Sequence, residues 1–124
     1  MKIILNNLSM VPIYEQLMDQ IKNEIIEGAL VAGTALPSVR TLSGELKISA
    51  LTVKKAYDHL EEEGFIVTVH GKGSYVAQTD RNLALEACRK TVENEFANAI
   101  LKARNFGFSD EEIQEIVLLM MEEK

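Results

Sequence analysis

One succession of patterns constrains this chain more than any other feature: two short helical segments joined at a tight turn, followed by two strand-like segments. Ser38 and Ser49 each precede an amphipathic segment, in the position that helix N-cap residues favour. Residues 65–70 are rich in β-branched residues, Gly71-Lys72-Gly73 turns the chain, and residues 74–77 return as a partner strand. This order predicts a winged helix-turn-helix, in which one helix and one hairpin are presented to the same surface.

A further helix is predicted upstream, between Pro12, which suits a first helical turn, and Gly28, which suits a helix C-terminus. The helix that follows Ser49 should end at Gly64. Apolar residues at helical spacing give each helix one buried face. The side chains that we expect in this core are Ile13, Leu17, Ile21 and Ile25 of the first helix, Val39, Leu42 and Leu46 of the second, and Val53, Ala56 and Leu60 of the third.

From Thr79 onward the pattern is that of two helices. Thr79-Asp80 opens a long helix that stops near Gly107, and Ser109 with Glu112 forms a capping box for the last helix. The expected buried stripes are Leu85, Cys88, Val92, Phe96, Ala99 and Ala103, then Ile113, Ile116, Val117 and Met120. A hairpin of about forty-five residues cannot bury both apolar faces alone. We therefore expect a winged helix-turn-helix domain at residues 1–78 and a helical tail at residues 79–124 that forms a homodimer.

The pattern of elements predicts a mostly α fold with a small β wing, and the apolar share of 47% of the 124 residues is enough for a core. No segment is long and apolar enough to be a membrane span or a secretory signal, so we expect a cytoplasmic protein. Cys88 is the only cysteine, and with His59 and His70 it is too scattered to suggest a metal site. We expect no cofactor and no enzymatic activity, since no nucleophile, base and orienting group cluster at a recognisable spacing.

The net charge of −6 counts against nucleic-acid binding, because Lys and Arg make the phosphate contacts that supply most non-specific affinity. The distribution of charge partly answers this objection. Residues 36–57 carry Arg40, Lys47, Lys54 and Lys55 against Glu45 alone, a local net charge of +3. From residue 79 onward, six cations face ten carboxylates, a net charge of −4. The acidic residues are thus mostly outside the segment that resembles a DNA-contacting element.

A longer series of residues stands at fixed spacing: Pro12-Ile13-Tyr14-Glu15-Gln16-Leu17, Ile25-Ile26-Glu27-Gly28, Gly33, Leu36-Pro37-Ser38-Val39-Arg40, Leu42, Ile48-Ser49, Thr52-Val53 with Ala56, Leu60-Glu61-Glu62-Glu63-Gly64-Phe65-Ile66, and Gly71-Lys72-Gly73-Ser74-Tyr75-Val76. In this order they resemble the GntR family of bacterial transcriptional regulators. The short tail resembles the YtrA-type branch, whose members carry no large effector domain. The resemblance implies a sequence-specific regulator, a repressor, that binds a palindromic site in double-stranded DNA as a dimer.

The start of each helix in the pair supplies candidate DNA contacts. Arg40 lies in the first turn of the second helix, where it can bind a phosphate or a guanine edge, and the resemblance implies a DNA contact there. The alternative is a surface arginine paired with Glu45. Ser49 and Thr52 begin the third helix, where hydroxyls and free backbone N–H groups can bind phosphate. Ser49 would cap this helix in any protein.

Ala50 and Leu51 mark a departure from the family, in which an arginine is common at the first of these positions. If this helix start enters the major groove, the two side chains offer apolar contact to thymine methyl groups, which predicts an A/T-rich half-site. Lys54 and Lys55 are adjacent and therefore point about 100° apart. We expect at least one of them to contact phosphate, and the pattern does not say which.

The predicted wing tip consists of His70, Gly71 and Lys72, and the resemblance implies that it reaches the neighbouring minor groove or its phosphates. The alternative is an ordinary polar hairpin turn. Arginines frequent in the family are missing from Val67-Thr68-Val69, so we expect a shallower dependence of DNA affinity on salt. Two further functions stay open: a winged-helix module that binds protein instead of DNA, and a small-molecule effector bound between tail helices of the dimer.

Overall fold

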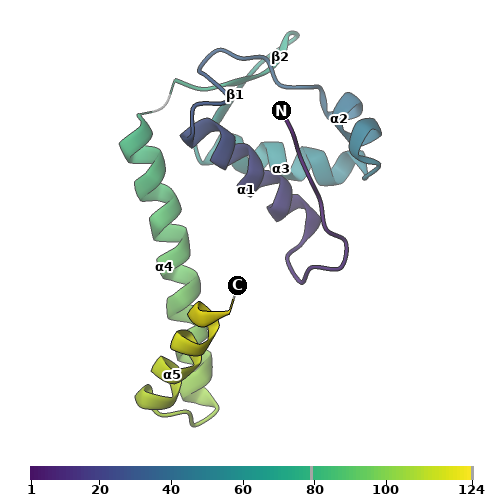
Figure 1. Ribbon diagram of the computed structural model, residues 1–124. Coiled ribbons are helices and arrows are strands. Elements are labelled where there is room, and N and C mark those ends of the chain that lie inside the picture. The colour runs from purple at the N-terminus through teal and green to yellow at the C-terminus, as the bar shows by residue number, and fades with distance from the viewer. Residues whose placement is uncertain (79, 124) are drawn as a thin grey trace. The chain divides into compact units, whose positions relative to one another are not determined.

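The computed structural model describes residues 1–78 and 80–123 and forms two compact units, Met1–Ala84 and Leu85–Lys124. Its elements in chain order are α1 (Ile13–Ile26), α2 (Val39–Leu46), α3 (Ala50–Glu62), β1 (Ile66–Val69), β2 (Gly73–Val76), α4 (Arg81–Asn105) and α5 (Asp110–Glu122), as Figure 1 shows. The described chain is mostly helical with one small sheet, which confirms the predicted fold class.

The core of the first unit is formed where α1 and α2 pack against α3. Leu17 and Ile21 of α1 and Val53 and Leu60 of α3 are completely buried, as their spacing predicted. Leu42 is the buried member of the predicted α2 stripe, while Val39 and Leu46 are half-buried because α2 is short and lies at the edge of the core. Each fully buried aliphatic side chain contributes roughly 1.5–3 kcal/mol to folding. This packing fixes α3 within the unit.

The wing is an antiparallel hairpin in which Ile66 pairs with Val76 and Val69 pairs with Gly73. Gly71 has φ +80° and Gly73 has φ +126°, conformations that residues with a Cβ atom rarely adopt. The segment before α2 adds to this hairpin, because the Leu36 N–H donates to the Ser74 carbonyl oxygen at 2.9 Å. The wing is therefore connected by backbone hydrogen bonds to the start of the helix-turn-helix.

The first residues of the chain lie along α1, an arrangement that the sequence analysis did not predict. The Gln20 side chain accepts from the Ile4 N–H at 2.8 Å and donates to the Ile4 carbonyl oxygen at 2.6 Å. Gln16 forms the same pair of bonds with Asn6, at 2.8 and 3.0 Å. Two glutamines one helical turn apart thus bind alternate residues of an extended segment.

In the second unit α5 folds back beside the C-terminal part of α4 (Figure 1). The turn follows the prediction, since Gly107 has φ +90° and the Ser109–Glu112 capping box is present. The Ser109 N–H donates to the Glu112 carboxylate at 2.9 Å and lowers the pKa of that carboxyl group. At the other end, Asp80 accepts from the Asn82 N–H at 2.8 Å, and the predicted role of Thr79 lies outside the described residues.

In a single chain the tail stripes are largely exposed, as expected of a hairpin too small to cover both apolar faces. Phe96 is 52% exposed, Ile116 is 42% exposed and Met120 is 66% exposed, and no described residue of α5 is buried. Cys88, expected to be buried, is half-buried. The physical reason is that two helices offer each other only one neighbour, so most of each apolar face stays uncovered. Across the described ranges, no helix is long and apolar enough to cross a membrane.

Candidate nucleic-acid interface

The same side-chain cap begins both helices of the helix-turn-helix. The Ser49 hydroxyl accepts from the Thr52 N–H at 3.0 Å and lies 2.8 Å from the Thr52 hydroxyl. Ser38 accepts from the Thr41 N–H at 3.0 Å in the same way. At the start of α3 the first two N–H groups, those of Ala50 and Leu51, precede any possible intrahelical acceptor. The cap fixes this end and leaves those donors directed out of the helix.

The turn between α2 and α3 depends on Lys47, which has φ 58° and is the one non-glycine residue with positive φ in the described chain. This left-handed conformation costs roughly 1–2 kcal/mol for a residue with a Cβ atom, so the surrounding structure must hold it. Near the start of α2, the Tyr57 hydroxyl donates to the Pro37 carbonyl oxygen at 2.8 Å. Burial, and secondly the charge of Glu45, raise the pKa of Tyr57 to about 12. The bond connects α3 to the start of α2.

The side chains predicted at the start of α3 are accessible. Leu51 is 78% exposed, Ala50 is exposed and Thr52 is half-buried beneath the cap. Arg40, in the first turn of α2, is also exposed, and its guanidinium pairs with no carboxylate among the described residues. The alternative pairing with Glu45 is therefore not present.

The two adjacent lysines of α3 diverge, as the helix geometry predicted. Lys54 forms an ion pair with Asp58 one turn later at 2.8 Å, and the hydrogen bond to that carboxylate raises the pKa of Lys54. Lys55 instead extends toward α1, where its ammonium lies 4.0 Å from the centroid of the Tyr14 ring. One lysine is thus paired with a carboxylate and the other with a neutral ring.

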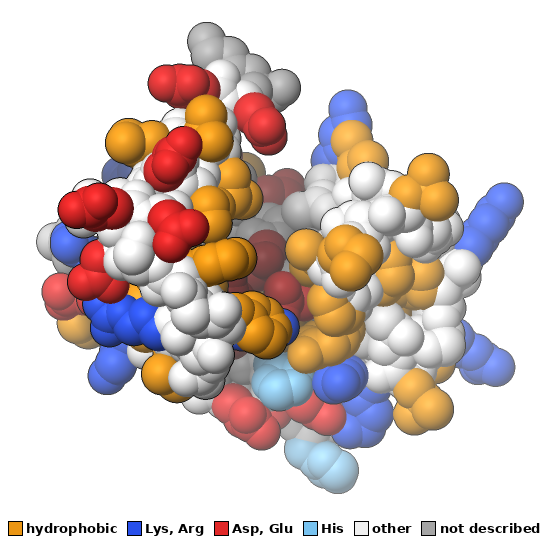
Figure 2. Space-filling model, turned by 90° about the horizontal axis from the view of Figure 1, so that it is seen from below, with side chains coloured by type: hydrophobic (Ala, Val, Ile, Leu, Met, Phe, Trp, Pro, Cys, Tyr) orange, Lys and Arg blue, Asp and Glu red, His pale blue; other side chains and the backbone are white. Residues whose placement is uncertain are grey.

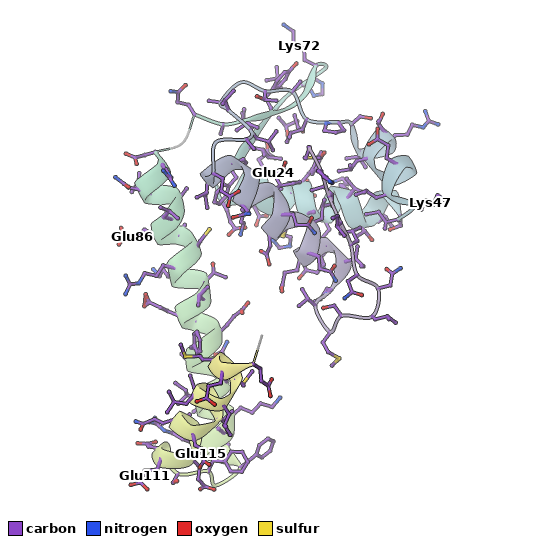
Figure 3. The ribbon with its side chains drawn as sticks, viewed as in Figure 1. Glu24, Lys47, Lys72, Glu86, Glu111 and Glu115 are labelled. Atoms are coloured by element: carbon purple, nitrogen blue, oxygen red, sulfur yellow. The ribbon has the colours of Figure 1, made fainter. Side chains whose placement is uncertain are left out.

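His70, Gly71 and Lys72 are exposed at the wing tip, and Figure 3 shows Lys72 extending from the end of the hairpin. Strand β1 of the wing is held to α3 by Glu61, whose carboxylate accepts from the Thr68 N–H at 3.1 Å. The structure therefore places every predicted contact residue on the first unit, in α2, in α3 and its N-cap, or in the wing. Figure 2 shows Asp and Glu side chains crowded over the helical tail, drawn at the left.

Three features of this surface were not predicted. Lys47 gave no signal, because left-handed backbone is expected of glycine and this position holds lysine. Tyr14 stood only in the motif that resembles the family, and Tyr57 was not singled out. Their partners, Lys55 and the Pro37 carbonyl, are set by how the helices pack. No sequence signal within one helix could have found such contacts.

A capped helix with an exposed first turn, connected to a preceding helix by a tight turn and to a hairpin with a cationic tip, defines a winged helix-turn-helix, a class of DNA-binding domain. Residues 13–76 match the profile of the family described as bacterial regulatory proteins, gntR family, and the chain belongs to that family. It is a DNA-binding transcriptional regulator.

Among relatives, the chain is 34% identical over 107 residues to the transcriptional repressor YtrA of Bacillus subtilis, covering 86% of this chain and 82% of that protein. Among solved structures, YtrA from Sulfolobus acidocaldarius, a GntR-family transcription factor, has 34% identity, a TM-score of 0.57 and coverage of 99% and 98% of the two chains. The DNA-binding domain of AraR in complex with an operator has 28% identity and a TM-score of 0.54 over 60% of this chain and 93% of that one.

Proposed function

We propose that this protein is a cytoplasmic repressor without enzymatic activity, which binds a palindromic operator as a dimer and blocks transcription by occupying it. The observation that carries this proposal is the start of α3, where a serine cap leaves the first N–H groups directed outward beside an exposed Leu51. A helix N-terminus of this kind is suited to phosphate, and its leading side chains to base edges in the major groove. The repressor activity named for YtrA supports the assignment.

Each candidate residue has a distinct proposed role. Ser49 and Thr52 with the free N–H groups bind phosphate, while Ala50 and Leu51 contact thymine methyl groups. Arg40 binds phosphate or a guanine edge, and the lysines of α3 supply phosphate contacts. At the wing, His70, Gly71 and Lys72 contact the neighbouring minor groove or its phosphates. The absence of a cation at residues 50 and 51 favours an A/T-rich half-site.

The proposed dimer forms through residues 79–124. Its support is the row of apolar side chains along α4 that one chain leaves exposed, including Val92 and Phe96. A second copy would cover this row and would set the two winged units a fixed distance apart, which a palindromic site requires. The sequence and the described structure assign no effector to this interface.

The proposal is tested by selecting binding sites from a pool of random duplexes and titrating the selected duplex at two salt concentrations. We expect a palindromic consensus with A/T-rich half-sites. Four cations in each subunit, Arg40, Lys54, Lys55 and Lys72, limit the slope of log affinity against log salt to no steeper than about −7. Lys90→Ala in the tail serves as the matched control for loss of one exposed cation. Absence of any selected sequence would contradict the function, and a G/C-rich consensus under α3 would contradict the roles of Ala50 and Leu51.

A further inference from the structure

Tyr14, in the first turn of α1, contacts two side chains of α3. The ammonium of Lys55 is 4.0 Å from the centroid of its ring, which is within the range of a cation–π contact. The ring of His59, one helical turn further along α3, stacks on Tyr14 with centroids 5.7 Å apart and an interplanar angle of 25°. Lys55 and His59 are four residues apart and so share one face of α3. His59 therefore holds the Tyr14 ring in place while the ring contacts the Lys55 ammonium.

This contact distinguishes Lys55 from Lys54. Lys54 forms an ion pair with Asp58 at 2.8 Å, so a phosphate that approaches it must compete with a carboxylate. Tyr14 is uncharged, and a ring face occupies only one side of an ammonium group. Lys55 thus keeps its full positive charge and N–H donors for another ligand, while its long side chain is confined to one region.

We propose that Tyr14 is a positioning residue that holds the ammonium of Lys55 in place for a phosphate of the operator, and that Lys55, not Lys54, is the principal phosphate contact of α3. This inference rests on the proposed function, since it specifies which lysine contacts DNA and what orients it. A lysine held before binding loses less side-chain freedom on contact with phosphate than one that is mobile.

The test is a double-mutant cycle on the full-length protein, with the selected duplex as ligand. We expect Lys55→Gln to weaken binding about tenfold and to reduce the magnitude of the salt slope by about one for each subunit. Tyr14→Leu should weaken binding several-fold and reduce the slope in the same direction, whereas Tyr14→Phe, which keeps the ring, should bind like the original protein. In the Lys55→Gln background Tyr14→Leu should have no further effect, and Lys54→Gln alone should cost less than Lys55→Gln.

A second measurement keeps the proposal testable if Tyr14→Leu does not fold. In the NMR spectrum of the unchanged protein bound to the duplex, the ε-methylene protons of Lys55 should be shielded by the tyrosine ring, and those of Lys54 should not. Unshielded Lys55 protons would overturn the proposal.

Three results in the binding assay would also overturn it. The first is full affinity of Tyr14→Leu, and the second is equal losses of affinity for Tyr14→Phe and Tyr14→Leu, which would mean that the hydroxyl itself contacts DNA. The third is that Tyr14→Leu weakens binding as much in the Lys55→Gln background as it does alone. Full affinity of Lys55→Gln together with weakened binding by Arg40→Ala would overturn the inference and leave the proposed function intact. A protein that selects no sequence at all would overturn both.

Discussion

The winged unit and the helical tail carry similar apolar periodicity but differ in what covers it. Leu60 in α3 has no exposed surface, whereas Phe96, at an equally regular position in α4, is 52% exposed. Two helices, α1 and α2, and strand β1 of the hairpin pack on α3, whereas among the described residues of the second unit α5 is the one helix beside α4. The comparison teaches that periodicity indicates which side chains share a face, while the number of neighbouring elements decides whether one chain covers that face.

The largest expected effect comes from a charge on the open face of the tail. Phe96→Glu should dissociate the proposed dimer, because a buried unpaired carboxylate is strongly unfavourable. Loss of the second winged unit should weaken binding to the palindrome by about 10²- to 10⁴-fold. Sedimentation gives the oligomeric state and titration gives the affinity, with Glu95→Gln on the same helix as control. A Phe96→Glu protein that remains dimeric would show that this face is not the interface.

A cavity in the winged unit should have the next largest effect. Leu60→Ala should lower the free energy of unfolding by about 2–5 kcal/mol, because it removes a completely buried side chain. Val92→Ala in the tail should lower the free energy of unfolding by about 0.5 kcal/mol or less at concentrations where the chain is monomeric. Chemical denaturation measures both. Equal costs would mean that the tail forms a core of its own within one chain.

Arg40→Ala tests the proposed DNA contact in the first turn of α2. If Arg40 binds a base pair, its loss should cost about 1–3 kcal/mol of binding free energy and relax selectivity at one position. If it binds only phosphate, the cost should be smaller and uniform across sequences. Competition between the selected duplex and singly altered duplexes distinguishes the two cases. Unchanged affinity for every duplex would remove Arg40 from the interface.

Removal of helix caps compares the two units directly. Ser49→Ala should cost about 0.5–2 kcal/mol in the free energy of unfolding of the winged unit, since the Thr52 N–H loses its acceptor. Ser109→Ala removes the corresponding cap in the tail and should leave the unfolding of the winged unit unchanged. Thermal unfolding followed by NMR at resolved core methyl groups measures both variants. Destabilisation of the core by Ser109→Ala would indicate that the two units unfold together.

A last expected effect is a dependence of stability on alkaline pH. The pKa of Tyr57 is raised from 10.0 to about 12 in the folded chain. Its stabilising contribution is therefore complete below pH 10 and is lost as the pH rises toward 12. Tyr57→Phe should show a smaller loss of unfolding free energy over this range, with Tyr75→Phe as the control. Equal pH dependence in Tyr57→Phe and the unchanged protein would contradict the raised pKa.

The elements and caps of this chain could be predicted because their causes are local. Ser38, Ser49 and the Ser109–Glu112 pair act within one helical turn, and Gly71 is required by the hairpin itself. The left-handed Lys47 and the contact between Tyr14 and Lys55 could not be predicted, because they depend on how separate helices pack. The positions of the tail stripe follow from spacing, and its exposure in one chain follows from the small size of the hairpin. The roles of individual residues in DNA binding remain predictions.

The central claim, that the start of α3 and the wing bind the operator together, is tested most directly by amide hydrogen exchange with and without the selected duplex. In the free protein the N–H groups of Ala50 and Leu51 should exchange rapidly, because helix geometry provides them no acceptor. On binding we predict slower exchange at residues 50–55 and 70–72 together. Unchanged exchange at the start of α3, with protection only in the tail, would contradict the account.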